Sequence, residues 1–393
     1  MHVAVRLPLS PLVPRHRIGG LFPTDTGTMT VSDLAAEYPS LHDIVRRAYN
    51  NLSDGAWGYL AGGAETETTL RRNRMALDTL AFRPRVCRNV HELDTSGTLL
   101  GQRMRIPVLL APIGSLETFD PSRRGGPSSA EAADRFDIVH MLSSRCAPGL
   151  EETAAAADNA RIFQLYVRGD AAFEDDYVRR AVDNGYYAFC ITVDTAHYSR
   201  RERDFDNRFV KTWRVGAGGM EWQALYTWDN VKRFKDTHDV PLILKGIATA
   251  EDAALCVEHG VDGVYVSNHG GRQLDHGRGS IDVLPEVVEA VGGKAAVIVD
   301  GAINRGTDIV KAMALGADAV GIGRMQGYGL AAEGVDGLVR VLELLEEEIR
   351  ICFGLLGVTG FAELEPSHLC KADPVNPPHV ASAFPLIDLP HRY

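Results

Sequence analysis

The sequence of 393 residues has few cysteines and no long apolar run. Its six cysteines form no Cys-x-x-Cys pair, and their scatter fits neither a zinc site nor a disulfide framework. We therefore expect reduced thiols, no bound metal and a cytoplasmic location. Because no apolar stretch approaches the about 20 residues that span a bilayer, we also expect no membrane span.

Positive charge is not in excess either. Lysine and arginine total 41 and the acidic residues 52, so the formal net charge is -11. Proteins that bind nucleic acid non-specifically are usually basic, so no nucleic-acid partner is expected. Hydrophobic residues make up 45% and charged residues 24%, as in ordinary globular proteins, which excludes a largely disordered chain.

The chain divides into three parts. Prolines interrupt the apolar stretches of residues 1–30, so this segment is a poor secretion signal and is expected to be a loosely ordered extension, with Met29 as an alternative start. Residues 31–370 form the main domain, with no linker that would separate a second one. Residues 371–393 are a proline-rich C-terminal tail, expected to pack along a surface or a neighbouring subunit.

Eight short apolar runs alternate with helical patterns in the main domain. Several runs are rich in β-branched residues, as buried parallel strands are, and the segments between them have apolar residues at three- and four-residue spacing. The runs are 107–112, 138–142, 161–166, 188–193, 240–244, 262–266, 296–300 and 318–322. This alternation predicts an α/β fold of the closed (β/α)8 TIM-barrel type, with a doubly wound open sheet as the alternative.

The segments outside the barrel are also predicted. Residues 40–61 have a helical pattern and 62–105 an irregular one, so we expect an N-terminal helical cap over one end of the barrel. Residues 331–356 are predicted to form one long helix after the last strand.

Polar or charged residues follow seven of the predicted strands. The carboxyl ends of all strands of a TIM barrel meet at one rim, where the chemistry of this fold lies, so we expect a site there rather than a purely structural barrel. The glycine-containing segments DGAINRG (300–306) and GIGR (321–324) follow the last two strands. Backbone amides and a helix N-terminus at this place predict a phosphate site.

Two side chains at this rim are candidates for chemistry. Lys245 ends an apolar strand, so its ammonium is expected to be partly desolvated and to form a Schiff base or to stabilise an anion, unless it reaches solvent. His269 stands between Asn268 and two glycines, which permit a ligand to come close, and histidine can move a proton near neutral pH. Asp194 is the natural carboxylate to orient it.

With the segment SNHGGRQLD (267–275), the sequence resembles the FMN-dependent L-2-hydroxy-acid oxidase and dehydrogenase family, which includes glycolate oxidase, lactate oxidase and mandelate dehydrogenase. The resemblance covers roughly residues 40–370. Further motifs that carry it, in order, are YLAGGAE (59–65), FRPR (82–85), FQLYV (163–167), TVDT (192–195), RRE (200–202), NRF (207–209), LKGI (244–247) and RGTDIVKAMALGA (305–317).

The resemblance implies FMN as the cofactor and assigns its contacts. Residues implied to contact the flavin ring are Pro112, Ile113, Gly114, Ser143, Gln164, Thr192 and Lys245, the last stabilising the negative charge of the reduced ring. Residues implied to contact the ribityl chain are Ser267 and Asp300, and those implied to hold the phosphate are Gly301, Ala302, Asn304, Gly323 and Arg324. The family usually has arginine at position 304, so either one phosphate ion pair is missing here or Arg305 replaces that arginine.

The substrate site is implied in the same way. Arg201 and Arg272 would clamp a carboxylate, because the guanidinium fork matches that anion. Tyr59 would add a hydrogen bond to the carboxylate, and Tyr166 would contact the substrate hydroxyl. His269, oriented by Asp194, would take a proton, so His269, Tyr166 and Asp194 are the implied catalytic residues.

Arg145 is the departure that most affects substrate preference. It stands in SSRCAPG (143–149), where glycolate oxidase has a bulky apolar residue that lines the pocket. Either Arg145 faces the pocket and contacts substrate, or it turns away and pairs with an acid such as Glu117. The variable segment 210–227 is also short compared with many relatives.

The resemblance implies oxidation of an L-2-hydroxy acid to the 2-oxo acid, with electrons passing to FMN and then to oxygen or a soluble acceptor. Relatives suggest a homotetramer. Oxidative decarboxylation, or oxidation of a larger natural-product or peptide substrate on the same scaffold, is the alternative that Arg145 and the short segment motivate. A non-catalytic flavin-binding protein is a third hypothesis.

Overall fold

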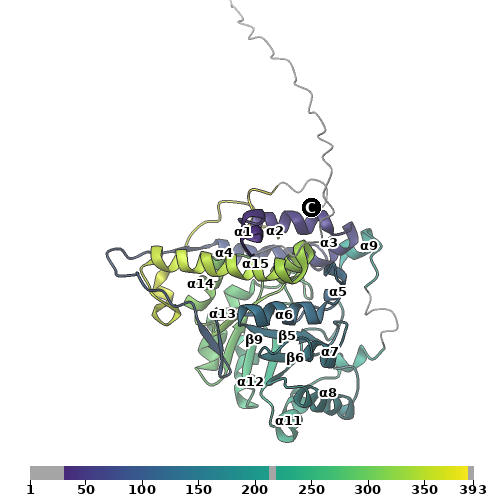
Figure 1. Ribbon diagram of the computed structural model, residues 1–393. Coiled ribbons are helices and arrows are strands. Elements are labelled where there is room, and N and C mark those ends of the chain that lie inside the picture. The colour runs from purple at the N-terminus through teal and green to yellow at the C-terminus, as the bar shows by residue number, and fades with distance from the viewer. Residues whose placement is uncertain (1–30, 212–217, 388–393) are drawn as a thin grey trace, which may run out of the picture.

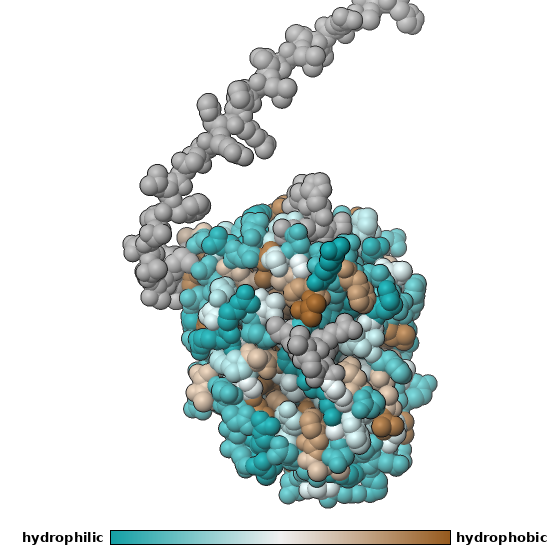
Figure 2. All heavy atoms as spheres, turned by 90° about the vertical axis from the view of Figure 1, so that its right-hand side faces the viewer, coloured by the Kyte–Doolittle hydropathy of each residue, from teal (hydrophilic) through white to brown (hydrophobic). Residues whose placement is uncertain are grey.

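The computed structural model describes residues 31–211 and 218–387 (Figure 1). The expected extension at 1–30 and the end of the tail, 388–393, lie outside the described residues. In the described part of the chain, no helix is long and apolar enough to cross a membrane. The face shown in Figure 2 carries mostly hydrophilic side chains with hydrophobic ones scattered between them, as protein surfaces do.

The core is a closed barrel of eight parallel strands, in which the last strand pairs with the first. In barrel order they are β4 Val108–Leu110, β5 Val139–Ser143, β6 Arg161–Leu165, β7 Ala188–Thr192, β8 Leu242–Ile247, β9 Gly263–Val266, β10 Ala296–Val299 and β11 Ala319–Ile322. Closure confirms the predicted TIM barrel and excludes the open sheet. The eight apolar runs located these strands because nearly every strand residue is buried, on one side in the barrel and on the other under helices.

Strand β8 runs farther than the sequence predicts. Its pairing with β9 shifts register between Lys245 and Ile247. Gly246 at this shift has a φ of 114°, and a Cβ there would lie 2.6 Å from the Cβ of Asp194. The glycine therefore lets the segment that carries Asp194 pack directly against β8.

Each barrel strand is followed by one or more helices, and the longer of these cover the outside of the barrel (Figure 1). The helices that follow the strands are α5 Leu116–Phe119, α6 Gly126–Phe136, α7 Leu150–Ala154, α8 Ala171–Asp183, α9 Glu202–Asp206, α10 Glu221–Ala224, α11 Trp228–Thr237, α12 Ala250–Glu258, α13 Ser280–Val291, α14 Gly306–Ala314 and α15 Arg324–Leu356. The last helix begins directly after β11, earlier than the predicted residue 331. Its backbone departs from helical geometry at Glu333 and Gly334, so the apolar pattern is interrupted there.

An N-terminal cap precedes the barrel, as predicted, but residues 62–105 are not irregular. The elements outside the barrel are α1 Val31–Glu37, α2 Leu41–Asn51, α3 Asp54–Ala61, α4 Thr68–Asp78, β1 Leu80–Phe82, β2 Gly97–Leu99, β3 Gln102–Met104, two 3-10 turns at Phe361–Glu363 and Pro366–His368, and β12 Leu369–Lys371. The sequence does not predict α4, because the buried face of this helix includes Thr69, Asn73 and Arg74 and its apolar periodicity is therefore weak.

The described part of the tail packs on the protein's own surface. Strand β12 pairs antiparallel with β1, and farther along the tail Val380, Ala381 and Phe384 are buried. The Phe384 ring meets the ring of His42 edge-on at 5.8 Å between centroids. These contacts tie the tail to the helical cap.

A buried ion pair joins the cap to the barrel. Arg74 of α4 donates to Asp308 of α14 at 2.8 Å from both terminal nitrogens, and both side chains are almost fully buried. Asp308 also accepts the backbone amides of Asn304 and Arg305 at 3.0 and 3.1 Å. The pair therefore fixes the start of α14 and the loop before it.

We expect Arg74→Ala to lower the free energy of unfolding by about 3–5 kcal/mol, because it leaves the Asp308 carboxylate buried without its cation. Arg179→Ala is the control: that side chain is 62% exposed and pairs with surface acids, so its loss should change the free energy of unfolding far less. Chemical denaturation followed by circular dichroism measures both. Equal losses would contradict the assigned role of the pair.

Candidate active site

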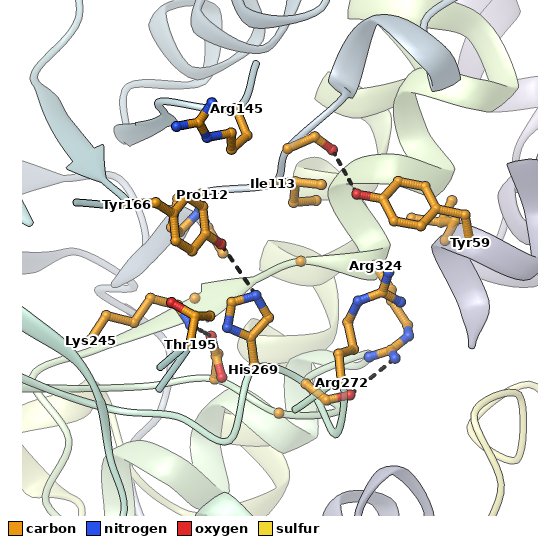
Figure 3. Close-up of a pocket in the computed structure, with 18 of the residues that line it drawn as sticks. Tyr59, Pro112, Ile113, Arg145, Tyr166, Thr195, Lys245, His269, Arg272 and Arg324 are labelled. Carbon is orange, nitrogen blue, oxygen red and sulfur yellow. Dashed lines mark hydrogen bonds and ion pairs between the residues drawn. The ribbon is translucent and has the colours of Figure 1, made fainter. Parts of the chain in front are cut away.

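One large pocket opens at the carboxyl ends of the barrel strands (Figure 3). Its walls come from the loops after the strands and, on one side, from Tyr59 and Leu60 of α3. Predicted site residues that line it are Tyr59, Pro112, Ile113, Gly114, Arg145, Tyr166, Arg201, Lys245, His269, Arg272, Asp300, Gly301, Ala302, Asn304, Gly323 and Arg324. The barrel therefore brings together most of the residues that the sequence singles out.

His269 and Asp194 form the pair expected from the sequence. The imidazole Nδ1 lies 2.9 Å from the Asp194 carboxylate, and Nε2 lies 3.3 Å from the Tyr166 hydroxyl. We assign the ring proton to Nδ1, since the carboxylate can only accept, which leaves the lone pair of Nε2 on the Tyr166 side. His269 has a φ of 60°, a left-handed conformation that aims the ring inward at an energetic cost.

The charge states of this pair suit proton transfer. Burial is the largest influence on the pKa of His269 and lowers it from the ordinary value of 6.5, although Asp194 acts in the opposite direction. Burial alone would raise the pKa of Asp194, but His269 and Lys245 hold it below the usual range. A neutral imidazole beside an ionised carboxylate is a base ready to take a proton.

Lys245 is fully enclosed and does not reach solvent. Its ammonium donates to the Ser267 hydroxyl at 2.8 Å and lies 3.5 Å from Asp300. The Ser267 hydroxyl donates in turn to Asp300 at 2.7 Å and accepts the His269 amide at 3.0 Å. Burial would lower the pKa of Lys245, but Asp300 and Asp194 outweigh burial and raise it. An ammonium that stays protonated favours anion stabilisation over Schiff-base formation.

A buried amide contributes an acceptor close to the lysine. Gln164 of β6 donates to the Thr192 hydroxyl of β7 at 2.9 Å, while its Oε1 is buried with no hydrogen-bond partner. The Ser143 side chain at the end of β5 is also buried and accepts the Arg145 amide at 3.2 Å. An unpaired buried carbonyl is costly, so Gln164 is prepared for a donor from a ligand.

Two arginines face one another on the His269 side of the pocket. Arg201 lies over the Tyr198 ring, and Arg272 lies over the Tyr59 ring and donates to the Gly62 carbonyl at 2.7 Å. Burial, and next the charge of Arg201, lower the pKa of Arg272 to about 10. Neither guanidinium forms an ion pair with a described carboxylate. Two buried cations with this arrangement form a site for an anion such as a carboxylate.

At the other predicted anion site, Arg324 follows the open backbone of Gly323. Its guanidinium donates to the carbonyls of Ala61, Gly62 and Gly270 at 2.9–3.1 Å. A Cβ added to Gly323 would meet no atom within 4 Å, so the backbone here borders empty pocket space.

A search against protein-family models matches residues 48–371 to the FMN-dependent dehydrogenase model. The chain belongs to the FMN-dependent dehydrogenase family. Glycolate oxidase 1 of Oryza sativa subsp. indica is 37% identical over 335 residues, covering 80% of this chain and 90% of that protein. Glycolate oxidase of Spinacia oleracea is 35% identical over 355 residues. The crystal structure of mandelate oxidase aligns with a TM-score of 0.78 at 37% identity, covering 86% of this chain and all of the other.

This FMN-dependent dehydrogenase is an oxidoreductase, and the residues present fit its cofactor. The unpartnered Gln164 oxygen suits the single ring N–H donor of a flavin. The protonated Lys245 suits the negative charge of a reduced flavin, and the open backbone at Gly323 beside Arg324 suits a phosphate.

The structure does not support the expectation that Arg305 replaces a phosphate-binding arginine. Its guanidinium donates to Glu348 of α15 at 3.1 Å and to the Ala383 carbonyl of the tail at 3.2 Å, and it is absent from the pocket wall. Residue 305 is the N-cap of α14, whose side chain is directed outward. Asn304, by contrast, lines the pocket.

Arg145 lines the pocket and does not pair with Glu117. The Glu117 carboxylate instead accepts the Ala147 amide at 3.3 Å. Sequence reasoning missed other residues of the wall, namely Arg168, Thr195, Tyr198, Met220 and Gln223. Arg168 could have been found, because it closely follows the predicted strand 161–166, at the same rim as the other candidates.

We expect Lys245→Met to lower the midpoint potential of bound FMN by about 30 mV or more, which equals a tenfold loss of preference for the two-electron-reduced form. The reason is the loss of the buried cation beside the flavin. Lys232→Met, on an exposed ammonium paired with Asp236, should leave the potential unchanged. An anaerobic redox titration measures both, and an unchanged potential at full FMN occupancy would refute the role given to Lys245.

Proposed function

We propose that this protein oxidises an L-2-hydroxy acid to the corresponding 2-oxo acid, with FMN as the electron acceptor in the pocket. The observation that carries the proposal is His269, whose Nε2 lies beside Tyr166 in the same pocket as the Arg201 and Arg272 guanidinium groups. A base next to a carboxylate site is the arrangement that a 2-hydroxy acid requires. The similarity to glycolate oxidase and mandelate oxidase supports this reaction class.

The arginines bind and orient the substrate. Arg201 and Arg272 take its carboxylate, for which their buried nitrogens have no competing carboxylate among the described residues. The Tyr59 hydroxyl, which donates a hydrogen bond to the Gly114 carbonyl at 3.4 Å in this structure, adds a third donor for the substrate carboxylate. Fixing the carboxylate places the α-carbon near His269 and orients it for reaction.

The side chains around His269 move the proton. Nε2 accepts a proton from the substrate, and the ionised Asp194 stabilises the imidazolium that results. Burial raises the pKa of Tyr166, so its hydroxyl stays protonated and donates to the substrate oxygen. FMN, when bound, supplies the acceptor for the two electrons that the substrate loses.

The same residues would hold FMN. Gln164, with Ser143 and Thr192 beside it, would bind the edge of the flavin ring that carries its N–H donor. Lys245 would stabilise the negative charge of the reduced ring, and the turn of Pro112, Ile113 and Gly114 would support its face. Ser267 and Asp300 would contact the ribityl chain, and the backbone of Gly301, Ala302, Asn304 and Gly323, together with Arg324, would bind the phosphate.

Location, assembly and final acceptor complete the proposal. All six cysteines are free thiols, which supports a reducing compartment such as the cytoplasm. We propose a homotetramer, and oxygen or a soluble molecule as the final electron acceptor. One relative is a peroxisomal (S)-2-hydroxy-acid oxidase of Oryza sativa subsp. japonica, so a cell-fractionation experiment is the test of location.

His269→Ala should retain FMN but slow flavin reduction by about 10²–10⁴-fold, the usual effect of removing a general base. His91→Ala, at an exposed histidine, should not change the rate. Anaerobic stopped-flow absorbance with saturating hydroxy acid gives the rates. Wild-type reduction by the His269 variant would overturn the mechanism, and failure of every hydroxy acid to reduce wild-type FMN would overturn the function.

The pH dependence has a defined sign. Because the pKa of His269 lies below 6.5, the neutral base dominates at pH 7, and the reduction rate should fall as the pH falls through that pKa. The rate should not rise further between about pH 7 and 8. A limb that instead continues upward well above pH 7 would assign the base to another group.

A further inference from the structure

A second pair of arginines lines the pocket away from Arg201 and Arg272. Arg145 follows β5, and Arg168 follows β6. Figure 3 shows Arg145 and Arg272 on opposite sides of the pocket, with Tyr166 and His269 between them in this view. The pocket therefore presents positive charge on both sides of the proposed base.

Arg145 is held at the edge of the cofactor turn by its backbone. Its carbonyl accepts the Ser115 amide at 2.9 Å, and its Cβ would lie 3.0 Å from a Cβ on Gly114. Its own amide is bound by the Ser143 hydroxyl at 3.2 Å. These contacts fix the base of the side chain, so the guanidinium stays at the pocket wall.

The charge of Arg145 is not balanced within the pocket. Of the described residues that line it, the one carboxylate is Asp300, which lies against Lys245. Arg145 makes no ion pair with a described acid, and its Nε is buried without a hydrogen-bond partner. Burial, and next the positive charge of Arg145, lower the pKa of Arg168 to about 10, so both groups remain cationic at neutral pH.

Two close guanidinium groups that are partly desolvated repel one another and favour an anion between them. Arg145 and Arg272 lie on opposite sides of the pocket in Figure 3, so a single carboxylate held by Arg201 and Arg272 does not also neutralise Arg145. A ligand that neutralises both sites must carry two anionic groups.

We propose that the substrate is a 2-hydroxy dicarboxylate, whose α-carboxylate binds Arg201 and Arg272 and whose distal carboxylate binds Arg145 and Arg168. This inference rests on the proposed function and narrows its substrate class. A substrate with a plain methyl or phenyl group would leave the Arg145 guanidinium without an anionic partner.

Binding of product analogues tests the proposal without turnover. We would titrate FMN-loaded protein with 2-oxoglutarate and with 2-oxobutyrate, which lacks the distal carboxylate, and follow the flavin absorbance. Oxaloacetate and pyruvate form a second pair with a shorter carbon chain. In whichever pair fits the pocket better, wild type should bind the dicarboxylate roughly 10- to 100-fold more tightly than the monocarboxylate, as expected for a charged hydrogen bond. Equal affinities in both pairs would overturn the proposal.

Variants assign the effect to the two arginines. Arg145→Leu and Arg168→Leu should each remove most of the dicarboxylate preference and change monocarboxylate affinity by less than about threefold. Arg145→Lys should retain part of the preference, because it keeps the charge but not the fork. Arg200→Leu is the control, since it removes an exposed cation next to Arg201 that pairs with Glu202. Equal losses on both ligand classes would contradict a distal site.

Two further measurements separate the possible failures. Sulfate alone is the probe for a free-anion site: Arg145-dependent sulfate binding with no dicarboxylate preference would refute the proposal. Anaerobic flavin reduction by malate, 2-hydroxyglutarate, lactate and 2-hydroxybutyrate gives the reaction. If the monocarboxylates reduce FMN as efficiently as the dicarboxylates, only this inference fails, whereas no reduction by any of them refutes the proposed function itself.

Discussion

Closure of the parallel barrel is the constraint on which the site depends. Because the strands run in one direction and β11 returns to β4, side chains that follow strands far apart in the sequence meet at one rim. Asp194 and His269 are 75 residues apart in the chain, yet they lie within hydrogen-bond distance. At the register shift of β8, Gly246 leaves room for Asp194 to approach the strand, since a larger residue there would displace Asp194.

The pocket holds buried charge of both signs. Asp300 lies against the Lys245 ammonium, and Asp194 accepts a hydrogen bond from Nδ1 of His269. Arg145, Arg201 and Arg272 make no ion pair with a described carboxylate. Because desolvated cations are costly, this imbalance is tolerated where an anionic ligand enters, so the charge pattern itself describes the ligand.

The sequence predicted the barrel because buried strands are apolar on both faces, and it predicted the rim because polar residues follow those strands. It failed for α4, where buried polar residues such as Arg74 interrupt the periodicity, since their partner Asp308 lies far away in the chain. It also failed for Arg305: position in the motif does not show that Glu348 holds the guanidinium outward. The sequence also left open whether Arg145 faces the pocket or pairs with Glu117, because position in a motif does not show where a side chain points. The structure places Arg145 in the pocket wall.

The Ser267 hydroxyl has a consequence for how the site responds to change. It accepts hydrogen bonds from the Lys245 ammonium and the His269 amide and donates one to Asp300. One small side chain therefore contacts both the lysine proposed to stabilise reduced flavin and the histidine proposed to take the proton. Residues that share a hydrogen-bond partner do not contribute independently. Substitutions at positions 245 and 269 should therefore be non-additive, because a change at either residue alters the hydrogen bonds that Ser267 makes with the other.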